Sequence, residues 1–372
     1  MLGDEGFFMK IIISGGGTGG HIYPAVAIAN ELKAIDPNIE ILFVGAEGKM
    51  EMEKVPKAGY KIIGLPIAGI NRANMLANLG LPFKLIKSLW KTYKIIKDFK
   101  PNIAIGVGGY ASGPTLIMAN LLGVPTLIQE QNSFAGVTNK FVAKRAKKIC
   151  VAYPNMERFF PKEKIVMTGN PVRKDILETA SKRERAMKHF GLDAERKTLL
   201  IIGGSQGART INEAIFAGLN ELISSDLQII WQTGKLFIDK AKTKVESLLT
   251  NRVYVSDFIY DMDLAYAAAD LVVSRAGALS VSELCLAEKP SILVPLPTAA
   301  EDHQTQNAMS LVDVSAAWFV KDVEASNILV GKIIELADNQ ALMQELSRNM
   351  KTLARPNAGK EIASEVLKII GE

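Results

Sequence analysis

Residues 10–21 have the sequence KIIISGGGTGGH, in which a short apolar run leads directly into a loop rich in glycine. The same arrangement recurs in GVGGYASG (residues 106–113) and in GGSQGAR (residues 203–209), each of which also follows an apolar run. A strand followed by glycines and a helix start directs backbone N–H groups and the positive end of the helix dipole toward one point. Such loops suit a phosphate or sugar oxygen, so we expect ligand contacts in both halves of the chain.

The rest of the chain alternates short apolar runs with longer segments of helical periodicity. This alternation predicts an α/β protein with parallel sheets covered on both faces. Residues 10–32 and 197–219 each run from strand through glycine loop to long helix, so each is expected to begin a doubly wound domain. Facing each other, two such sheets would place the first and third loops across one cleft. The predicted strands are 10–13, 39–44, 103–106, 125–128, 149–152, 198–202, 228–231, 253–255, 271–274 and 291–294, and the predicted helices include 25–32, 211–223 and 279–286.

The polar segment GNPVRK (residues 169–174) is the best candidate for a linker between these domains. It gives a first domain of residues 1–172 and a second of residues 173–354. A chain of 372 residues has room for two such domains.

Composition narrows the functional class. The chain is 48% hydrophobic and 22% charged, which is typical of a folded protein. Cys150 and Cys285 lie in apolar surroundings, which indicates reduced thiols and a cytosolic setting. The first residues resemble no signal peptide, and no apolar run approaches the roughly 20 residues of a transmembrane helix. The formal charge of +5 is too small to indicate nucleic acid without a motif, and leaves anionic lipid as the alternative anionic partner.

Residues 15–20 also fit the dinucleotide fingerprint G-x-G-x-x-G, and Glu47 follows the next strand roughly where a ribose-binding acid belongs. An NAD-dependent dehydrogenase is therefore an alternative. The fingerprint explains only one of the three loops, however, and does not require the side chains of Thr18 and His21. Histidine is scarce in this chain, and an imidazole at the mouth of a glycine loop points to proton transfer.

The segment SRAGALSVSE (residues 274–283) follows a predicted strand, and its small residues allow a ligand to approach the next helix. Glu283 lies about one turn into that helix, where a carboxylate can accept hydrogen bonds from the two hydroxyls of a ribose. Ser280 and Glu283 also have the S-x-x-E spacing of a capping box. The spacing alone leaves both interpretations open.

Asp261-Met262-Asp263 matches the D-x-D pattern that binds metal-nucleotide in some glycosyltransferases. We favour the interpretation in which these aspartates cap the helical run 264–269 and complement its dipole. No further cluster of acids or histidines completes a metal site.

Lysines recur about once per turn from residue 84 to residue 100, among large apolar side chains. The segment is interpreted either as one covering helix with a solvated lysine face or, together with the apolar loop before it, as a patch for an anionic membrane surface. The proposed patch consists of Leu76, Leu79, Leu81, Phe83, Lys84, Lys87 and Lys91.

Taken together, these motifs resemble the MurG family of bacterial transferases, which attach N-acetylglucosamine to undecaprenyl-diphospho-muramoylpentapeptide. The resemblance rests on stretches that occur in family order and span most of the chain. They are GGGTGGH (15–21), GVGGYASGP (106–114), EQNSFAGVTNK (130–140), GNPVR (169–173), GGSQGAR (203–209), SRAGALSVSE (274–283) and DHQTQNA (302–308).

The resemblance implies a GT-B fold, in which two Rossmann-like domains face a central cleft and a C-terminal helix (about 355–372) rejoins the first domain. It implies that the first domain takes the lipid acceptor, lipid I, and that the second takes UDP-N-acetylglucosamine (UDP-GlcNAc). The product is lipid II, for peptidoglycan synthesis. The family needs no cofactor and no metal to turn over nucleotide-sugar. The location implied is the cytoplasmic face of the cell membrane, as a peripheral protein.

The resemblance also implies roles for individual residues. His21 is our choice for the catalytic base, with Glu130 in reserve. Glu283 would hold the ribose hydroxyls, Ile259 would lie beside the uracil, and Ser205 and Arg173 would meet the diphosphate. The full set of donor contacts is Thr18, Gly19, Gly20, Asn132, Arg173, Ser205, Ile259, Ala278, Leu279, Ser280, Val281, Ser282, Glu283 and Gln304. The loop for the acceptor and its diphosphate is Gly108, Gly109, Tyr110 and Ser112.

The chain departs from many relatives at Gln129, where they have histidine, so that position is not assigned a catalytic role. A UDP-GlcNAc 2-epimerase on the same fold is the second functional alternative. It would need neither a lipid patch nor acceptor loops.

Overall fold

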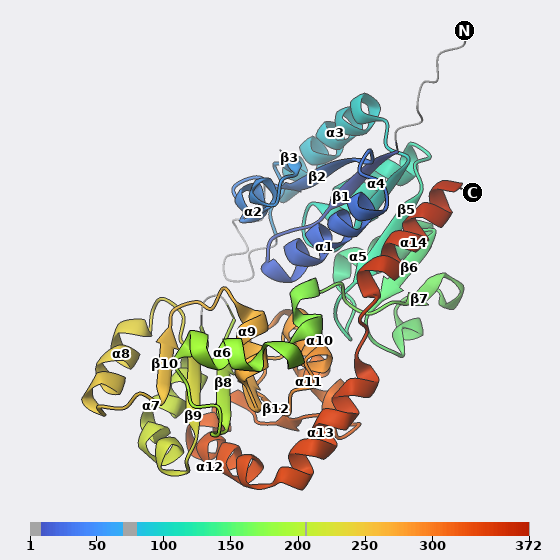
Figure 1. The fold of residues 1–372 in the computed structure, drawn as a ribbon. Coiled ribbons are helices and arrows are strands. Elements are labelled where there is room, and N and C mark those ends of the chain that lie inside the picture. Colours follow the sequence, from blue (N-terminus) through green and yellow to red (C-terminus); the bar gives the residue numbers. More distant parts are fainter. Residues whose placement is uncertain (1–8, 70–79, 205–206, 372) are drawn as a thin grey trace. The chain divides into compact units, whose positions relative to one another are not determined.

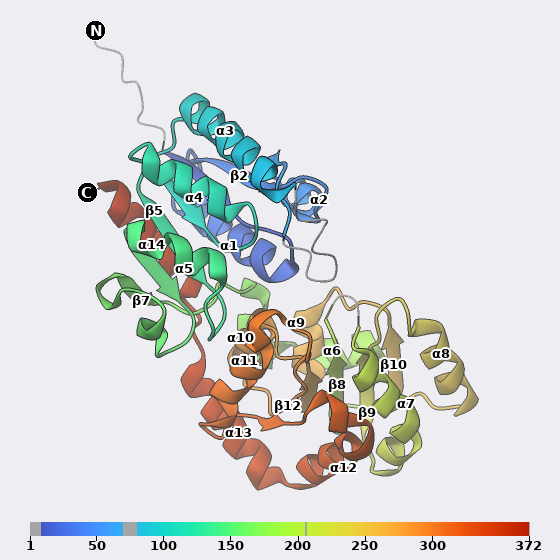
Figure 2. The same cartoon turned by 180° about the vertical axis from the view of Figure 1, so that it is seen from behind.

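The structure is a computed structural model that describes residues 9–69, 80–204 and 207–371. The chain forms two compact units: Met1–Val172 with Asn357–Glu372, and Arg173–Pro356. The first unit is built on a parallel sheet of seven strands and the second on one of six, each with helices on both faces (Figures 1 and 2). The predicted class, α/β with two Rossmann-like domains, is confirmed.

The sheet of the first unit has the strand order β3-β2-β1-β4-β5-β6-β7. Its strands are β1 (Lys10–Ser14), β2 (Glu40–Ala46), β3 (Lys61–Leu65), β4 (Ile103–Gly106), β5 (Thr126–Glu130), β6 (Lys148–Val151) and β7 (Ile165–Met167). Its helices are α1 (Gly19–Ile35), α2 (Glu51–Lys57), α3 (Leu81–Phe99), α4 (Ser112–Leu121), α5 (Val137–Val142) and α14 (Ala358–Gly371), with short 3-10 helices η2 (Ala143–Arg145), η3 (Met156–Arg158) and η4 (Lys162–Lys164).

The core of the first unit follows the two-residue period of its strands. Ile11 and Ile13 point to one face, into a cluster with α1 and α14, whereas Ile12 points to the other, into a cluster with α3 and α4. Successive side chains of a strand alternate between the faces, so a strand that is apolar throughout must be covered on both sides. That is why the sequence KIII gives a central strand.

The last helix, α14, belongs to the first unit although the whole second unit precedes it in the chain. Its side chains Ile362 and Val366 are fully buried in the same cluster as Ile28 of α1. In Figure 1 this red helix lies beside the blue α1.

The second unit has the strand order β10-β9-β8-β11-β12-β13. Its strands are β8 (Thr198–Ile202), β9 (Gln228–Gln232), β10 (Val253–Ser256), β11 (Leu271–Ser274), β12 (Ser291–Leu293) and β13 (Trp318–Phe319). Its helices are α6 (Arg183–Phe190), α7 (Arg209–Ser224), α8 (Ile238–Ser247), α9 (Met262–Ala268), α10 (Ala278–Leu286), α11 (His303–Val312), α12 (Ala325–Asp338) and α13 (Gln340–Leu353), with η5 (Lys174–Glu178), η6 (Ala180–Lys182), η7 (Ala300–Asp302) and η8 (Asp322–Glu324).

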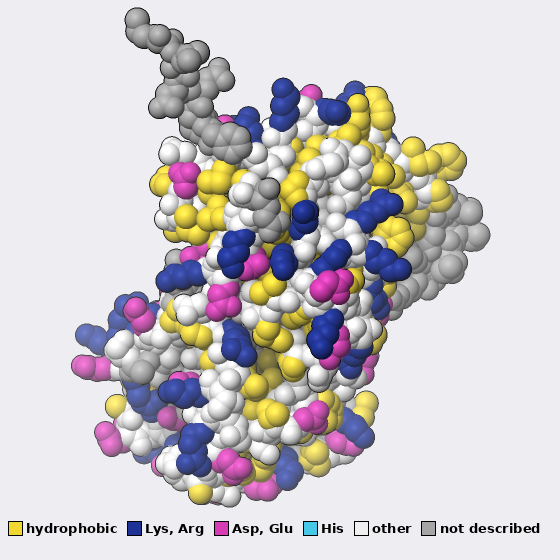
Figure 3. All heavy atoms as spheres, turned by 90° about the vertical axis from the view of Figure 1, so that its right-hand side faces the viewer, with side chains coloured by type: hydrophobic (Ala, Val, Ile, Leu, Met, Phe, Trp, Pro, Cys, Tyr) yellow, Lys and Arg dark blue, Asp and Glu magenta, His cyan; other side chains and the backbone are white. Residues whose placement is uncertain are grey.

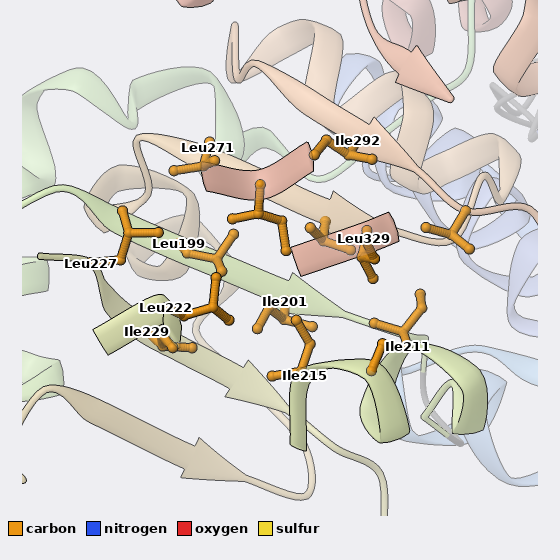
Figure 4. Close-up of a cluster of buried hydrophobic side chains, with 14 of the residues drawn as sticks. Leu199, Ile201, Ile211, Ile215, Leu222, Leu227, Ile229, Leu271, Ile292 and Leu329 are labelled. Atoms are coloured by element: carbon orange, nitrogen blue, oxygen red, sulfur yellow. The ribbon is translucent and has the colours of Figure 1, made fainter. Parts of the chain in front are cut away.

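One face of this second sheet packs against α7 and α12 (Figure 4). Ile201 of β8, Ile215 of α7 and Leu329 of α12 are among the buried side chains of that cluster. The packing fixes the ends of β8 and β11, from which the third glycine loop and the segment leading into α10 emerge.

Three strands have no counterpart among the predicted ones: β3, β7 and β13. β3 carries Gly64 within a short run, and β7 and β13 are edge strands of three and two residues. Helix α1 begins at Gly19, before the predicted start at residue 25, and continues through Pro24. The N–H that proline lacks would have bonded to the carbonyl of Gly20, which is an exposed residue, so the loss is tolerated.

Within the described ranges, no helix combines the length and the apolar character needed to cross a membrane. Both cysteines are buried and free, and burial raises the pKa of each thiol to about 12.

Candidate functional site

In the first unit, His21 lies in the first turn of α1, just after the glycine loop. Its Nδ1 atom is 3.1 Å from the carbonyl oxygen of Gly16 and 3.3 Å from the hydroxyl of Thr18. A carbonyl oxygen can only accept, so this contact assigns the proton of the neutral ring to Nδ1 and the lone pair to Nε2. The loop thus holds the imidazole in the tautomer that a base acting through Nε2 requires.

The second glycine loop packs directly on the first. A Cβ atom at Gly108 would lie 2.9 Å from Nε2 of His21, and one at Gly109 would lie 2.3 Å from the carbonyl oxygen of Gly16. Both glycines also have positive φ angles, of 89° and 87°. Any larger residue at either position would displace His21 or the backbone that holds it.

The first glycine loop is held by a buried carboxylate, that of Glu51. Glu51, the first residue of α2, is 1% exposed, and it accepts the N–H of Gly17 at 2.9 Å and that of Ala46 at 3.0 Å. The expectation that this loop offers its N–H groups to a phosphate is therefore wrong at Gly17. A carboxylate at this point repels a pyrophosphate, which argues against dinucleotide binding.

The acid expected for ribose in the dinucleotide alternative, Glu47, makes an ion pair with Lys91 of α3 at 2.8 Å. Its carboxylate therefore joins β2 to the covering helix. The glycine loop and Glu47, which are the two features of the dinucleotide fingerprint, thus both have structural roles within the first unit.

The residues predicted to form the acceptor loop differ in their exposure to solvent. The ring of Tyr110 is half exposed and lies against Gly17 and Gly69, where a Cβ atom would be 3.7 Å and 2.1 Å from it. Ser112 is fully buried, and its hydroxyl has no hydrogen-bond partner among the described residues. Tyr110 is accessible to a ligand in this structure and Ser112 is not.

Glu130 ends β5 and is 1% exposed. One carboxylate oxygen accepts the backbone N–H of Asn132 at 3.1 Å, and the other accepts the N–H of Gly136 at 3.0 Å and the amide of Asn139 at 2.9 Å. Burial raises the pKa of this carboxyl, and these hydrogen bonds oppose the rise. The geometry favours a carboxylate that holds the following loop, and with it Asn132, rather than one that faces a substrate.

In the second unit, Glu283 projects from α10 and its side chain is 15% exposed. Tyr266 of α9 donates a hydrogen bond from its hydroxyl to Oε2 at 3.1 Å, and Nε of Arg173 is 3.9 Å from Oε1. Burial raises the pKa of the Glu283 carboxyl, while the charge of Arg173 and the bond from Tyr266 lower it.

The capping-box interpretation of this segment is wrong. Helix α10 begins at Ala278 with Gly277 as its N-cap residue, so Ser280 lies inside the helix and no side chain caps it. The hydroxyl of Ser282 donates to the carbonyl of Ala278 at 3.0 Å. Glu283 therefore has no capping role, and its assignment to the ribose stays a prediction. The neighbouring residues Leu279 and Val281 belong to the same first turns of α10.

Around the third glycine loop, Ser205 lies outside the described residues. Gln232, at the end of β9, bridges two neighbouring segments: it accepts the N–H of Ile259 at 3.0 Å and donates to the carbonyl of Gly204 at 2.9 Å. The segment expected to contact uracil is thus tied to the loop expected to contact the diphosphate. Gln304 accepts the N–H of Leu296 at 3.0 Å and so holds the turn before α11.

The D-x-D segment binds basic side chains of its own unit. Asp263 pairs with Lys182 at 2.8 Å, and Asp261 is 3.6 Å from Nε2 of His189. Asp261 precedes α9 but its side chain makes no capping hydrogen bond, so the capping expectation is wrong for it. Among the described residues, no cluster of three or more His, Cys, Asp or Glu side chains could hold a metal ion.

Five residues of the predicted patch lie on α3, namely Leu81, Phe83, Lys84, Lys87 and Lys91, and the other two, Leu76 and Leu79, lie outside the described residues. Phe83 is 77% exposed, and Ile86 and Trp90 of the same helix are also exposed, at 65% and 60%. Figure 3 shows lysine and arginine side chains interspersed with exposed hydrophobic ones over the upper part of the molecule. Lys84 and Lys87 are exposed, whereas Lys91 is engaged by Glu47.

Sequence reasoning missed Glu51, Tyr266 and Gln232. Each is buried and acts on another protein group rather than on solvent. No motif marks them: Glu51 stands in the ordinary helical segment EMEK, and Tyr266 stands in an alanine-rich run.

Comparison with known proteins agrees with these two units. The glycosyltransferase family 28 N-terminal domain matches residues 11–151, and the family 28 C-terminal domain matches residues 198–362. A solved structure of Acinetobacter baumannii MurG superposes with a TM-score of 0.78 at 30% identity, over 97% of this chain and 99% of that one. A UDP-GlcNAc 2-epimerase from Neisseria meningitidis has a TM-score of 0.68 at 15% identity, over 97% and 100%, which shows a shared fold alone.

Curated relatives are much more similar in sequence. A UDP-N-acetylglucosamine–N-acetylmuramyl-(pentapeptide) pyrophosphoryl-undecaprenol N-acetylglucosamine transferase of Bacteroides fragilis is 56% identical over 98% of this chain and 97% of its own. An enzyme of the same name from Cytophaga hutchinsonii is 56% identical over 97% of each chain. The chain therefore belongs to glycosyltransferase family 28, and within that family to the MurG enzymes.

Proposed function

We propose that this protein transfers N-acetylglucosamine from UDP-GlcNAc to the 4-hydroxyl of the N-acetylmuramic acid of lipid I, the undecaprenyl-diphosphate-linked MurNAc-pentapeptide. The product is lipid II, the precursor of peptidoglycan. The observation that carries the proposal is the 56% identity, over nearly the whole of both chains, to relatives named for this transfer.

We assign the proton transfer to His21. The attacking alcohol must lose its proton as the bond to the anomeric carbon forms, and a base within hydrogen-bond reach accelerates that step. The contact with Gly16 places the lone pair of the neutral imidazole on Nε2, the nitrogen beside Gly108. Displacement of UDP from the opposite side inverts the anomeric configuration from α to β.

We assign donor binding chiefly to the second unit. The carboxylate of Glu283 accepts hydrogen bonds from the ribose hydroxyls, and Ile259 lies beside the uracil. Arg173 and Ser205 face the diphosphate. Arg173 supports this role because its side chain is 44% exposed and only loosely paired with Glu283. Donors that meet the diphosphate stabilise the charge that develops on it as it departs. No cofactor and no metal are required in this proposal.

We further propose that the protein lies on the cytoplasmic face of the cell membrane and contacts anionic lipid through α3. The exposed aromatic and aliphatic side chains of this helix supply apolar area, and Lys84 and Lys87 supply charge. Each lysine near an anionic surface contributes about 1 kcal/mol. Such binding is weak and sensitive to salt.

One assay tests the reaction. The protein is incubated with UDP-GlcNAc and a lipid I analogue, and UDP release is followed with and without the acceptor. Acceptor-dependent release with formation of the disaccharide supports the proposal. Conversion of UDP-GlcNAc without acceptor would favour the epimerase, and a reaction that requires NAD would favour the dehydrogenase.

A further inference from the structure

Tyr266 is a fully buried residue whose side-chain hydroxyl contacts Glu283 in the candidate nucleotide site. Tyr266 belongs to α9, a helix in which every residue is buried, and the exposed fraction of Tyr266 itself is zero. Its hydroxyl is 3.1 Å from Oε2 of Glu283. The rigid ring is therefore anchored in the core and holds its hydroxyl donor against the carboxylate of Glu283.

The hydrogen-bonding capacity of Glu283 makes this contact significant. A carboxylate has about four acceptor positions. Tyr266 uses one on Oε2, and among the described residues Arg173 approaches the other oxygen, with its Nε 3.9 Å from Oε1. Positions remain for the two hydroxyls of a ribose. A glutamate side chain has several rotatable bonds, so a fixed donor restricts the orientations in which those positions meet a ligand.

We propose that Tyr266 is a positioning residue for nucleotide recognition: its hydroxyl fixes the carboxylate of Glu283 in the orientation that accepts the ribose hydroxyls of the donor. This inference rests on the proposed function, because it takes Glu283 as the ribose-binding group. Tyr266 itself does not touch the nucleotide.

The test compares the affinities for UDP and 2′-deoxy-UDP in the full chain, measured by calorimetry. The wild-type protein is expected to prefer UDP by about ten- to a hundredfold, the range for a hydrogen bond to a charged group. Tyr266→Phe keeps the ring and removes the donor, so it is expected to reduce this preference to a few-fold, chiefly by weakening UDP. Tyr153→Phe is the matched control, since Tyr153 is a buried tyrosine of the first unit.

The preference ratio separates positioning from a merely structural role. A structural effect lowers the affinity for both nucleotides equally and leaves the ratio unchanged, which would overturn the inference. A wild-type protein that does not distinguish the nucleotides would overturn the ribose assignment of Glu283, and the inference with it.

A second measurement keeps the test independent of changes in stability. In a Glu283→Ala background, Tyr266→Phe is expected to cause no further loss of UDP affinity, because Tyr266 acts only through the carboxylate. An additional loss equal to that seen in the wild-type background would overturn the proposal.

Discussion

Glu51→Gln provides the most direct test of how the first glycine loop is held. The carboxylate accepts one backbone N–H on each oxygen, from Gly17 and from Ala46. Glutamine has the same shape but only one acceptor oxygen. One of the two backbone N–H groups must then face the NH₂ group of the glutamine. Glu51 is only 1% exposed, so the position is shielded from water.

The expected cost follows from this count. A buried donor left without an acceptor costs about 1–3 kcal/mol, and the remaining hydrogen bond loses the strength that the charge gave it. We therefore expect Glu51→Gln to lower the free energy of unfolding by about 2–4 kcal/mol. For a unit of this size, that corresponds to a fall in Tm of roughly 5–15 °C. Turnover falls as well, because His21 is held by the same loop.

The assay is thermal or urea unfolding of the full chain, with turnover measured in parallel. Glu53→Gln is the matched control: Glu53 lies on the same helix, its side chain is 65% exposed, and it forms a surface ion pair with Lys57. Its Tm is expected to remain essentially unchanged. A Tm for Glu51→Gln equal to that of the control would refute the reasoning, since it would mean that the loop does not depend on this acceptor.

Four further predictions concern catalysis, ionisation, metal and membrane. His21→Ala is expected to lower turnover by about 10²–10⁴-fold with a smaller effect on the donor KM; near-normal turnover would remove His21 from the mechanism. Because burial raises the pKa of Glu283, the folded state keeps this proton to higher pH than the unfolded state does. The unfolding free energy therefore falls as pH rises from about 4.3 through the raised pKa, by about 1.4 kcal/mol per unit of the rise, and Glu283→Gln should lack this fall in a Tm series across pH. EDTA is expected to leave turnover intact; loss of activity that Mg²⁺ or Mn²⁺ restores would contradict the metal-free proposal. Replacing Lys84 and Lys87 together by glutamate is expected to weaken binding to anionic vesicles by about 30-fold or more while turnover on a short-chain acceptor survives, and equal binding to neutral and anionic vesicles would refute the electrostatic contact.

Most of the fold could be predicted because hydrophobic periodicity and glycine loops are local signals. The central strands, such as residues 103–106, 198–202 and 271–274, have the predicted bounds. Short edge strands cannot be predicted in this way because they contain too few residues to show a period. β13 has two residues, and its pairing with β12 depends on where the rest of the unit places it.

The residues proposed to contact ligands stand in motifs that the sequence shows, whereas the buried residues that hold other protein groups do not. The loops that carry His21 and Glu283 are visible as motifs. The buried partners Glu51 and Tyr266 depend on contacts across 34 and 17 residues of sequence, which no local spacing encodes. For the same reason, the S-x-x-E spacing at Ser280 left a capping box open as one of two interpretations, and only the helix start at residue 278 excludes it.

The placement of α14 has a consequence for synthesis of the protein. Domains generally fold as units, from the N-terminus, while the ribosome still adds residues. Here Ile362 and Val366 belong to the apolar cluster over β1 and α1, so the first unit lacks part of its core until the last helix has been made. A chain that ends before residue 358 lacks the helix that covers this cluster, whereas it contains every element of the unit formed by residues 173–356. The unit that is synthesised first therefore depends, for its complete core, on the helix that is synthesised last.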